Sequence, residues 1–471
     1  MSESRNRVLR GGLRAVTGVL IVGVAATVAV MVGAAPLPSV TREPVALRVD
    51  TKQGGERTLV CAGSFAELGA DSRHPGDAVP SGTVGTVVSG AQPERGELER
   101  ERSGGSAPEV LRVAAGSGFA AAQTQAVQTE TLRGLTAQSC AEPVNEQWLV
   151  GGTTMVGSST TVNLGNPSEK PATVQLTVFD ENGRVDSAQT SGVLVPAGSE
   201  RVVSMNGYAP SRERIAVRVV STGAAVTASL GVAQVTGLQS FSVDTVTRQL
   251  AADTTLVVPG VTNLGDGAHS HGETGDADEF QVVVRALSTT GRSGTATVRA
   301  VLGDGTSTDL GTLDLAGAKV GELTVKQWPE KANAVVIDAD VPIVGGVLGQ
   351  AAGTGQHDTA WFTPAPRLPA DTEIAAAVVD RGQLVLTNPG TEDATVRLGA
   401  SAAFAEGSAT PPQEYRVPAG AAIAVSTPGD SVILSSAPIY AGVRIALGGD
   451  IAGYPVLAEQ ERVTAITVYP R

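Results

Sequence analysis

The chain has 471 residues, enough for about three domains of ordinary size, and a formal net charge of −13 at pH 7. Because an acidic surface repels a phosphate backbone, this charge disfavours a nucleic-acid partner. Hydrophobic residues make up 42% of the sequence, which is ample for packed cores, whereas 57 glycines and 26 prolines favour turns and strands over long helices. We therefore expect an all-β protein.

An uncharged apolar segment covers residues 15–35, directly after a basic N-terminus. As a helix with a rise of ~1.5 Å per residue, it would span about 30 Å, the thickness of the hydrocarbon core of a bilayer. Four arginines precede it: Arg5, Arg7, Arg10 and Arg14. By the positive-inside rule, they place residues 1–14 in the cytoplasm as a basic stub and everything after the transmembrane helix outside the plasma membrane.

A cleaved signal peptide is the alternative interpretation of this segment. Val32-Gly-Ala34 resembles a small-residue cleavage site, with the arginines as the basic region before it. The apolar run is longer than the usual signal core of about 7–15 residues, which favours a retained signal-anchor. In either case the bulk of the protein is predicted to be extracytoplasmic, in the cell envelope.

The segment after the apolar run changes composition twice. Prolines 36, 38 and 44 suit an extended tether over residues 36–56. Residues 57–146 are predicted to form an N-terminal extracytoplasmic segment. Within it we expect a mobile loop over residues 69–108, because Gly, Ser, Pro and mixed charges leave too little apolar surface to offset the entropy of ordering.

The chain contains two cysteines, Cys61 and Cys140, both in this N-terminal segment. Outside the cytoplasm, an even pair is more often a disulfide than a metal site or a catalytic thiol. Two buried free thiols are the alternative. A disulfide closing a loop of about 80 residues would stabilise the fold by about 4–5 kcal/mol on the chain-entropy model.

A repeat dominates the rest of the chain. Much of the stretch from Asn163 to Gly183, followed by Val195-Pro-Ala-Gly198, returns as Leu386 to Leu398, followed by Val417-Pro-Ala-Gly420. Both parts recur at the same offset of 222 residues. Because a shared offset across two separated motifs is hard to obtain by chance, the sequence predicts repeated modules, with Asn-Pro and Val-Pro-Ala-Gly as turn chemistry.

Alternation within the repeats predicts strands. Val174, Leu176 and Val178 alternate with polar residues, the period-two pattern of a strand buried on one face. Turn residues separate such strands every 8–12 residues or so, which indicates antiparallel sandwiches. We therefore predict tandem Ig-like antiparallel β-sandwich modules behind a single N-terminal transmembrane helix, with a barrel or a propeller as the alternative. The predicted modules are residues 147–252, 253–367 and 368–471.

Several short motifs resemble a known family. Leu135-Thr-Ala-Gln-Ser-Cys140, Pro143, Trp148-Leu-Val-Gly-Gly152 and Leu164-Gly-Asn-Pro167 are similar to the core signature of actinobacterial membrane-anchored exported proteins. That family is catalogued only as a domain of unknown function. The resemblance implies a cell-envelope location in an actinobacterium and implies no activity, because the family has none assigned.

The sequence contains few residues that are candidates for metal binding or catalysis. His269, His271 and Glu273 lie in a polar insert over residues 265–279 and are candidate metal ligands, although a surface loop explains them equally well. No nucleophile elbow, zinc-protease motif or phosphate-binding loop occurs in the sequence. We therefore predict no catalytic residues, no cofactor and no enzymatic activity.

The prediction for function is a non-enzymatic scaffold or protein-interaction module on the outer side of the membrane. Its expected partners are the membrane, through the N-terminal helix, and an envelope protein or wall polymer. An envelope hydrolase or glycan-modifying enzyme, with a site between modules, is the first alternative. A glycan- or peptidoglycan-binding protein is the second.

Overall fold

The structure, a computed structural model, describes most of the chain between residues 56 and 459. The described residues are 20, 22–27, 47–49, 56–74, 76–114, 116–129, 131–186, 192–236, 239–265, 278, 280–353, 356–405, 407–459 and 466–468. The chain divides into two units, one formed by Gly54–Glu461 and the other by Met1–Gln53 with Arg462–Arg471. Strands in antiparallel sheets dominate the described residues, which confirms the prediction of an all-β protein.

The smaller unit contains the two ends of the chain. Its strands β1 (Leu47–Val49) and β35 (Ile466–Val468) pair antiparallel. Of the predicted span 15–35, residues 20 and 22–27 are described and are helical; the rest lies outside the described residues. Within the described part of the chain, no helix has the length and apolar content needed to cross a membrane.

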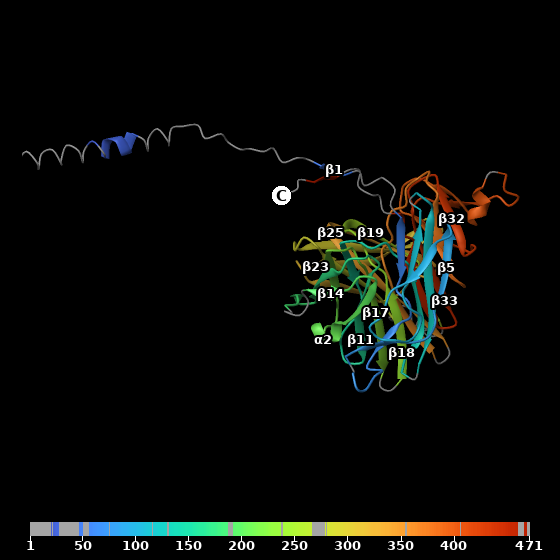
Figure 1. Ribbon diagram of the computed structural model, residues 1–471. Helices are drawn as coiled ribbons and strands as arrows, with labels where there is room; N and C mark the ends of the chain where they lie inside the picture. The colour runs from blue at the N-terminus through green and yellow to red at the C-terminus, as the bar shows by residue number, and fades with distance from the viewer. Residues whose placement is uncertain are drawn as a thin grey trace, which may run out of the picture. The chain divides into compact units, whose positions relative to one another are not determined.

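The larger unit consists of four blocks of strands (Figure 1). Block 1 holds β2 (Arg57–Cys61), β3 (Ala66–Leu68), β4 (Ala78–Pro80), β5 (Gly85–Gly90), β6 (Glu94–Glu97), β7 (Glu109–Val113), β8 (Phe119–Gln128) and β9 (Arg133–Ser139). Its sheets run β2-β7-β6, β3-β4 and β5-β8-β9. The predicted disulfide between Cys61 and Cys140 is present, and both cysteines lie in the core of this block.

The expectation of a mobile loop over residues 69–108 is wrong. Strands β4, β5 and β6 lie within it, and Leu98 is 3% exposed beside Val60 and Val110. Several of the charged residues that suggested a loop are paired with partners outside it. Arg95 lies 2.5 Å from Glu109, and Arg100 lies 2.7 Å from the buried Glu200 of the next block.

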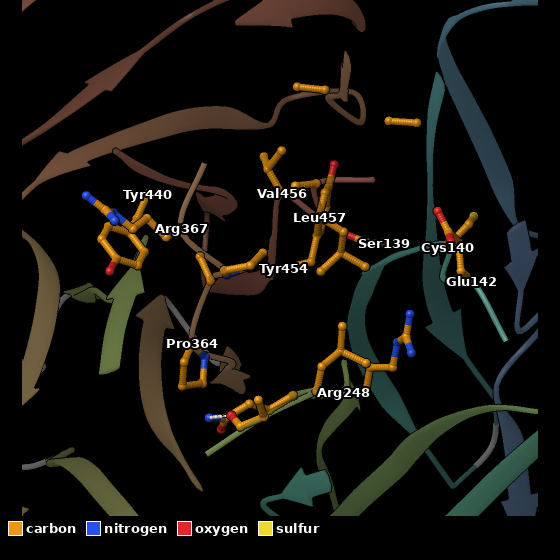
Figure 2. Close-up of a pocket in the computed structure, with 18 of the residues that line it drawn as sticks. Ser139, Cys140, Glu142, Arg248, Pro364, Arg367, Tyr440, Tyr454, Val456 and Leu457 are labelled. Atoms are coloured by element: carbon orange, nitrogen blue, oxygen red, sulfur yellow. Dashed lines mark hydrogen bonds between the residues drawn. The ribbon is translucent and has the colours of Figure 1, made fainter. Parts of the chain in front are cut away.

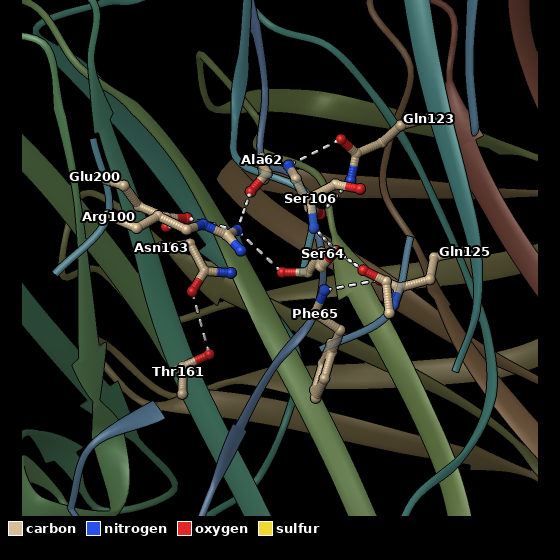
Figure 3. Close-up of polar contacts among 12 residues, drawn as sticks. Ala62, Ser64, Phe65, Arg100, Ser106, Gln123, Gln125, Thr161, Asn163 and Glu200 are labelled. Atoms are coloured by element: carbon tan, nitrogen blue, oxygen red, sulfur yellow. Dashed lines mark hydrogen bonds and ion pairs between the residues drawn. The ribbon is translucent and has the colours of Figure 1, made fainter. Parts of the chain in front are cut away.

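Figure 3 shows how this part of block 1 is held in place, with Gln123 and Gln125 of β8 beside the turn after β2. The Gln123 amide exchanges hydrogen bonds of 3.0 and 2.8 Å with the backbone of Gly63. Gln125 accepts one of 2.8 Å from the backbone of Phe65. Gln125 also donates to the Ser81 carbonyl at 2.7 Å. A side-chain partner distant in sequence, which composition cannot reveal, therefore helps to order residues 69–108.

Blocks 2 and 4 share one topology. Block 2 holds β10 (Glu146–Val150), β11 (Ser158–Asn166), β12 (Ala172–Asp180), β13 (Gly183–Arg184), β14 (Val193–Val195), β15 (Ser199–Ser204), α2 (Met205–Tyr208), β16 (Ala216–Thr222), β17 (Thr227–Thr236) and β18 (Gln239–Val246). Block 4 holds β27 (Ile374–Ala377), β28 (Gln383–Asn388), β29 (Ala394–Gly399), η2 (Ser401–Phe404), β30 (Gln413–Val417), β31 (Ala421–Val425), β32 (Asp430–Ser435), β33 (Tyr440–Leu447) and β34 (Asp450–Pro455).

In each of these blocks, two sheets face one core. The orders β10-β16-β12 and β15-β11-β17-β18 of block 2 correspond to β27-β32-β29 and β31-β28-β33-β34 of block 4. The repeated asparagines have matching contacts. Asn166 Nδ2 donates to the carbonyls of Lys170, Val195 and Pro196, and Asn388 Nδ2 to those of Glu392, Val417 and Pro418, at 2.8–3.3 Å. The repeat is therefore scaffold.

Block 3 forms a single eight-stranded sheet. Its strands are β19 (Asp253–Pro259), β20 (Asn263–Gly265), β21 (Val282–Ser288), β22 (Gly294–Leu302), β23 (Ser307–Leu315), β24 (Val320–Val325), β25 (Ala332–Gly353) and β26 (Gln356–Phe362). The 22-residue β25 pairs with β19 and β22 through its first half and with β21 and β26 through its second. It thus takes the place that the separate β16 and β17 occupy in block 2.

The last strand of each block meets the others at the centre of the unit, and we call β9, β18, β26 and β34 the central strands. β9 lies beside β18 and β34, and β26 lies beside the same two strands, so the four form a closed ring. A Cβ on Gly134 of β9 would lie 2.7 Å from the Val243 nitrogen, so glycine permits this close approach. The sheet edges that the central strands form are therefore covered.

Each central strand also fills the core of the preceding block. Trp361 of β26 packs in the core of block 2, and Ile451 of β34 in that of block 3. Val243 of β18 packs with Phe65 and Leu132 of block 1. Leu135 of β9 packs in the core of block 4, which closes the ring, and Figure 1 shows β5 of block 1 beside β32 of block 4. The four blocks are thereby interlocked.

Candidate functional site

A cavity of about 240 Å³ lies where the chain leaves the four central strands (Figure 2). The segments that line it come from all four blocks: 139–142, 248–253, 364–367 and 454–458. Figure 2 shows Cys140, Glu142 and Arg248 on one side of this cavity and Arg367 and Tyr440 on the other. We call it the axial pocket. Its lining therefore depends on the ring being closed.

The arginines on the side of Cys140 are buried. Arg57 is 4% exposed; its Nε lies 2.6 Å from Glu142 Oε1, and its Nη1 donates to the Phe119 carbonyl. Arg248 is also 4% exposed, yet its Nε and Nη1 have no hydrogen-bond partner within the described structure. Burial lowers the pKa of Arg248 to about 10, against the opposing effect of Glu142, so it stays cationic at neutral pH.

Aromatic and apolar side chains form the remaining wall. The Tyr454 hydroxyl donates to the Ala377 carbonyl at 2.9 Å and accepts from the Val379 nitrogen at 3.1 Å, and burial raises its pKa. Tyr440 is half-buried, and burial raises its pKa too. Leu59 and Phe119 also line the pocket. Both hydrogen bonds of the Tyr454 hydroxyl are thus made to the backbone. The wall therefore presents a mainly apolar surface to the pocket.

Two buried carboxylates lie between the central strands. Asp358 of β26 accepts hydrogen bonds from the backbone nitrogens of Leu135 at 3.1 Å and Ile451 at 3.3 Å, and so joins three central strands. Asp244 of β18 accepts one from the Trp361 nitrogen at 2.6 Å. Burial raises the pKa of Asp244 to about 7 and that of Asp358 well above its usual range.

These pKa values predict that stability falls as the pH rises. Between about pH 4 and 7, folded Asp244 holds a proton that the unfolded chain has lost, so raising the pH through this window weakens the fold, by about 4 kcal/mol for a shift of about 3 pH units. Asp244→Asn mimics the neutral acid. We expect urea denaturation to give a flatter pH profile for the variant and greater stability than the wild type at pH 8. Equal pH profiles for the two proteins would contradict this assignment.

His269, His271 and Glu273 are outside the described residues, and the described residues contain no cluster of potential metal ligands. His357, next to Asp358, is hydrogen-bonded through Nε2 to Gln350 Oε1 at 2.8 Å, and burial lowers its pKa to about 4. Neither the axial pocket nor the two aspartates were found from sequence, because their neighbours come from different blocks.

The tryptophans are core residues of the fold. Trp148, Trp328 and Trp361 are 7%, 5% and 3% exposed. Trp148 packs with Leu287 and Val344 of block 3, and Trp361 packs in block 2 under the guanidinium of Arg285, 4.6 Å from the ring centroid. Two of the three therefore hold neighbouring blocks together.

Comparison with known proteins identifies one family. The model of a family of unknown function (DUF5719) matches residues 78–428, which is most of the chain. No curated protein matches the chain significantly. A solved structure described as a biofilm-associated protein, BSP domain, is similar at 11% identity over 80% of this chain and 67% of that chain. Its TM-score of 0.13 is too low to inform the fold or the function.

Proposed function

Since the chain belongs to this family of unknown function, its role has to be inferred from its own geometry, and we propose that it is a non-enzymatic binding protein of the cell envelope. The observation that carries the proposal is the axial pocket, which is enclosed by segments from all four blocks. Pockets between domains are frequent ligand sites. The interlocked central strands provide a rigid frame, so the same unit suits presentation of a bound ligand or partner.

The chemistry of the lining favours binding over hydrolysis. Nucleophilic catalysis uses a hydroxyl or thiol beside a base, or an unengaged carboxylate. Here the Ser139 hydroxyl donates to the Pro455 carbonyl at 2.5 Å, Cys140 is in the disulfide, and the Glu142 carboxylate is paired with Arg57 at 2.6 Å. No histidine is among the described residues that line the axial pocket. An envelope hydrolase with a site between blocks therefore has less support than a binding protein.

The aromatic residues also bear on the alternative of a glycan-binding protein. Sugar-binding sites commonly stack the sugar ring on an exposed aromatic side chain. All three tryptophans are buried in cores, so none is placed to act as such a platform. The tryptophans therefore give the glycan-binding alternative no support.

The envelope location is part of the proposal and rests on the sequence. The apolar run 15–35 with four preceding arginines suits a signal-anchor, with the larger unit outside the plasma membrane of an actinobacterium. The disulfide supports an oxidising compartment. We further propose that blocks 2 and 4 are Ig-like β-sandwich modules, which their shared topology supports.

Affinity capture from membranes tests the function. The full chain, carrying a C-terminal tag in an actinobacterial host, is expected to be cleaved by external protease on intact cells. After cross-linking, it is expected to recover a defined envelope component, whereas tagged residues 1–56 alone recover none. Incubation with labelled cell-wall material is expected to release no label.

Release of label in proportion to the concentration of this protein would replace the proposal with the hydrolase alternative. Recovery of wall polymer without protein would support the glycan-binding alternative. Protection of the tag from external protease would overturn the proposed location.

A further inference from the structure

We propose that the axial pocket binds a carboxylate group carried by a small apolar molecule, with Arg248 as the counter-ion of that carboxylate. The inference rests on the proposed binding function and specifies the chemistry of its ligand. It is built on the contacts of Arg248, on the balance of charge around the pocket, and on the size and polarity of the cavity.

Arg248 differs from the other buried arginines of the described structure. Arg57 and Arg285 are 4% and 7% exposed, and each has a carboxylate 2.6 Å from its Nε. Arg285 also donates to the backbone carbonyls of Gly152 and Glu213. Arg248 is equally buried, but two of its nitrogens have no partner. An unpaired buried cation is costly to a fold unless something binds to it.

The charged side chains that line the pocket leave one positive charge without a partner. Glu142 lies beside Arg248 but is already neutralised by Arg57 at 2.6 Å. Across the pocket, Arg367 and Asp253 carry opposite charges and both act on Tyr440. One positive charge, that of Arg248, therefore remains. A carboxylate has a single charge and a planar shape that matches a guanidinium, whereas a phosphate would need a second free cation.

The size and walls of the pocket define the rest of the ligand. The cavity of about 240 Å³ is smaller than the range of about 300–1,000 Å³ typical of sites for drug-sized molecules. Leu59, Phe119, Leu256 and Val456 supply apolar lining. A group of the size of one apolar amino-acid residue fits both features. The carboxylate can belong to a free acid or to the last residue of a peptide.

The experiment is isothermal titration of the full chain with N-acetyl-leucine and N-acetyl-phenylalanine, each compared with its uncharged primary amide. We expect the acids to bind at least tenfold more tightly than the amides, because the amides cannot pair with Arg248. A tripeptide ending in leucine distinguishes the two sources: tighter binding than N-acetyl-leucine indicates a peptide end, and weaker binding indicates a free acid.

The variant Arg248→Met separates a ligand-binding role from a structural one. We expect it to lose acid binding at least tenfold and, at the same time, to melt at a temperature equal to or above that of the wild type, because methionine removes an unpaired buried charge. Arg218→Met is the matched control. Arg218 is paired with Glu146 at the surface of block 2, and its loss should leave binding unchanged.

Equal affinity for acids and amides would overturn the inference. So would unchanged acid binding by Arg248→Met, or a lower melting temperature for that variant without any acid binding by the wild type. Such results would leave the proposed envelope-binding function standing if membrane capture still succeeded, so the two proposals fail separately.

Discussion

Replacing Trp361 by alanine is expected to lower the free energy of unfolding by about 3–5 kcal/mol, the usual range for removing a large aromatic side chain from a core. Trp361 belongs to β26 of block 3 but packs in the core of block 2, and it is 3% exposed. The Trp361 side chain both fills a core and joins two blocks, and the substitution removes both contributions. Urea denaturation followed by circular dichroism measures the loss.

Trp328→Ala is the matched control, because Trp328 lies in the core of block 3 with residues of that block and is 5% exposed. Hydrogen exchange distinguishes the two variants. We expect Trp361→Ala to accelerate amide exchange in β11 and β17 of block 2, whereas Trp328→Ala accelerates it in block 3. If exchange in block 2 is unaffected by Trp361→Ala, the sharing of cores between blocks has no energetic importance.

Removing the disulfide has an effect of similar size. Cys61 and Cys140 are 79 residues apart, and opening a loop of that length is expected to lower stability by about 4–5 kcal/mol on the chain-entropy model. The double variant Cys61→Ser, Cys140→Ser is expected to melt at a lower temperature than the wild type. Differential scanning calorimetry measures the difference, with wild-type protein reduced in denaturant and refolded under reducing conditions as the comparison.

The state of the cysteines is checked separately. Both are at most 3% exposed, so the folded wild type is expected to resist reduction and to show no alkylatable thiol by intact mass. Two alkylatable thiols in non-reduced protein would show that the bridge does not form. An unchanged melting temperature in the double variant would mean that the unfolded chain gains little freedom when the bridge is absent.

The features that could be predicted from sequence are those encoded within one segment. The alternation over Val174, Leu176 and Val178 predicted a strand with one buried face, and all three are at most 1% exposed. The repeat predicted that Asn166 and Asn388 have the same structural role, which their matching hydrogen bonds confirm. Local patterns were sufficient here because the partners are close in sequence or repeat at one offset.

The axial pocket and the ring could not be predicted in this way. Arg248, Asp358 and Trp361 owe their roles to neighbours in other blocks, and no periodicity links such positions. One signal was present in the family-like motif Trp148-Leu-Val-Gly-Gly152. A Cβ on Gly151 would lie 2.9 Å from Cγ of Trp361, so that glycine makes space for an indole from the next block. The same limit explains the error at residues 69–108, where Arg100 has its partner Glu200 at a sequence separation of 100 residues.

The closure of the ring has a consequence for how the chain acquires its structure. The cores of the first three blocks are each completed by a residue of the following block, and the core of block 4 is completed by Leu135 of block 1. The last cores and the ring can therefore close only after block 4 has emerged. The Ser89 hydroxyl donates a hydrogen bond to the carbonyl of Ser431, at a sequence separation of 342 residues. Contacts of such long sequence separation form last. Folding should therefore be slow and should finish only after the whole chain is available, which makes the unfinished chain a natural client for chaperones.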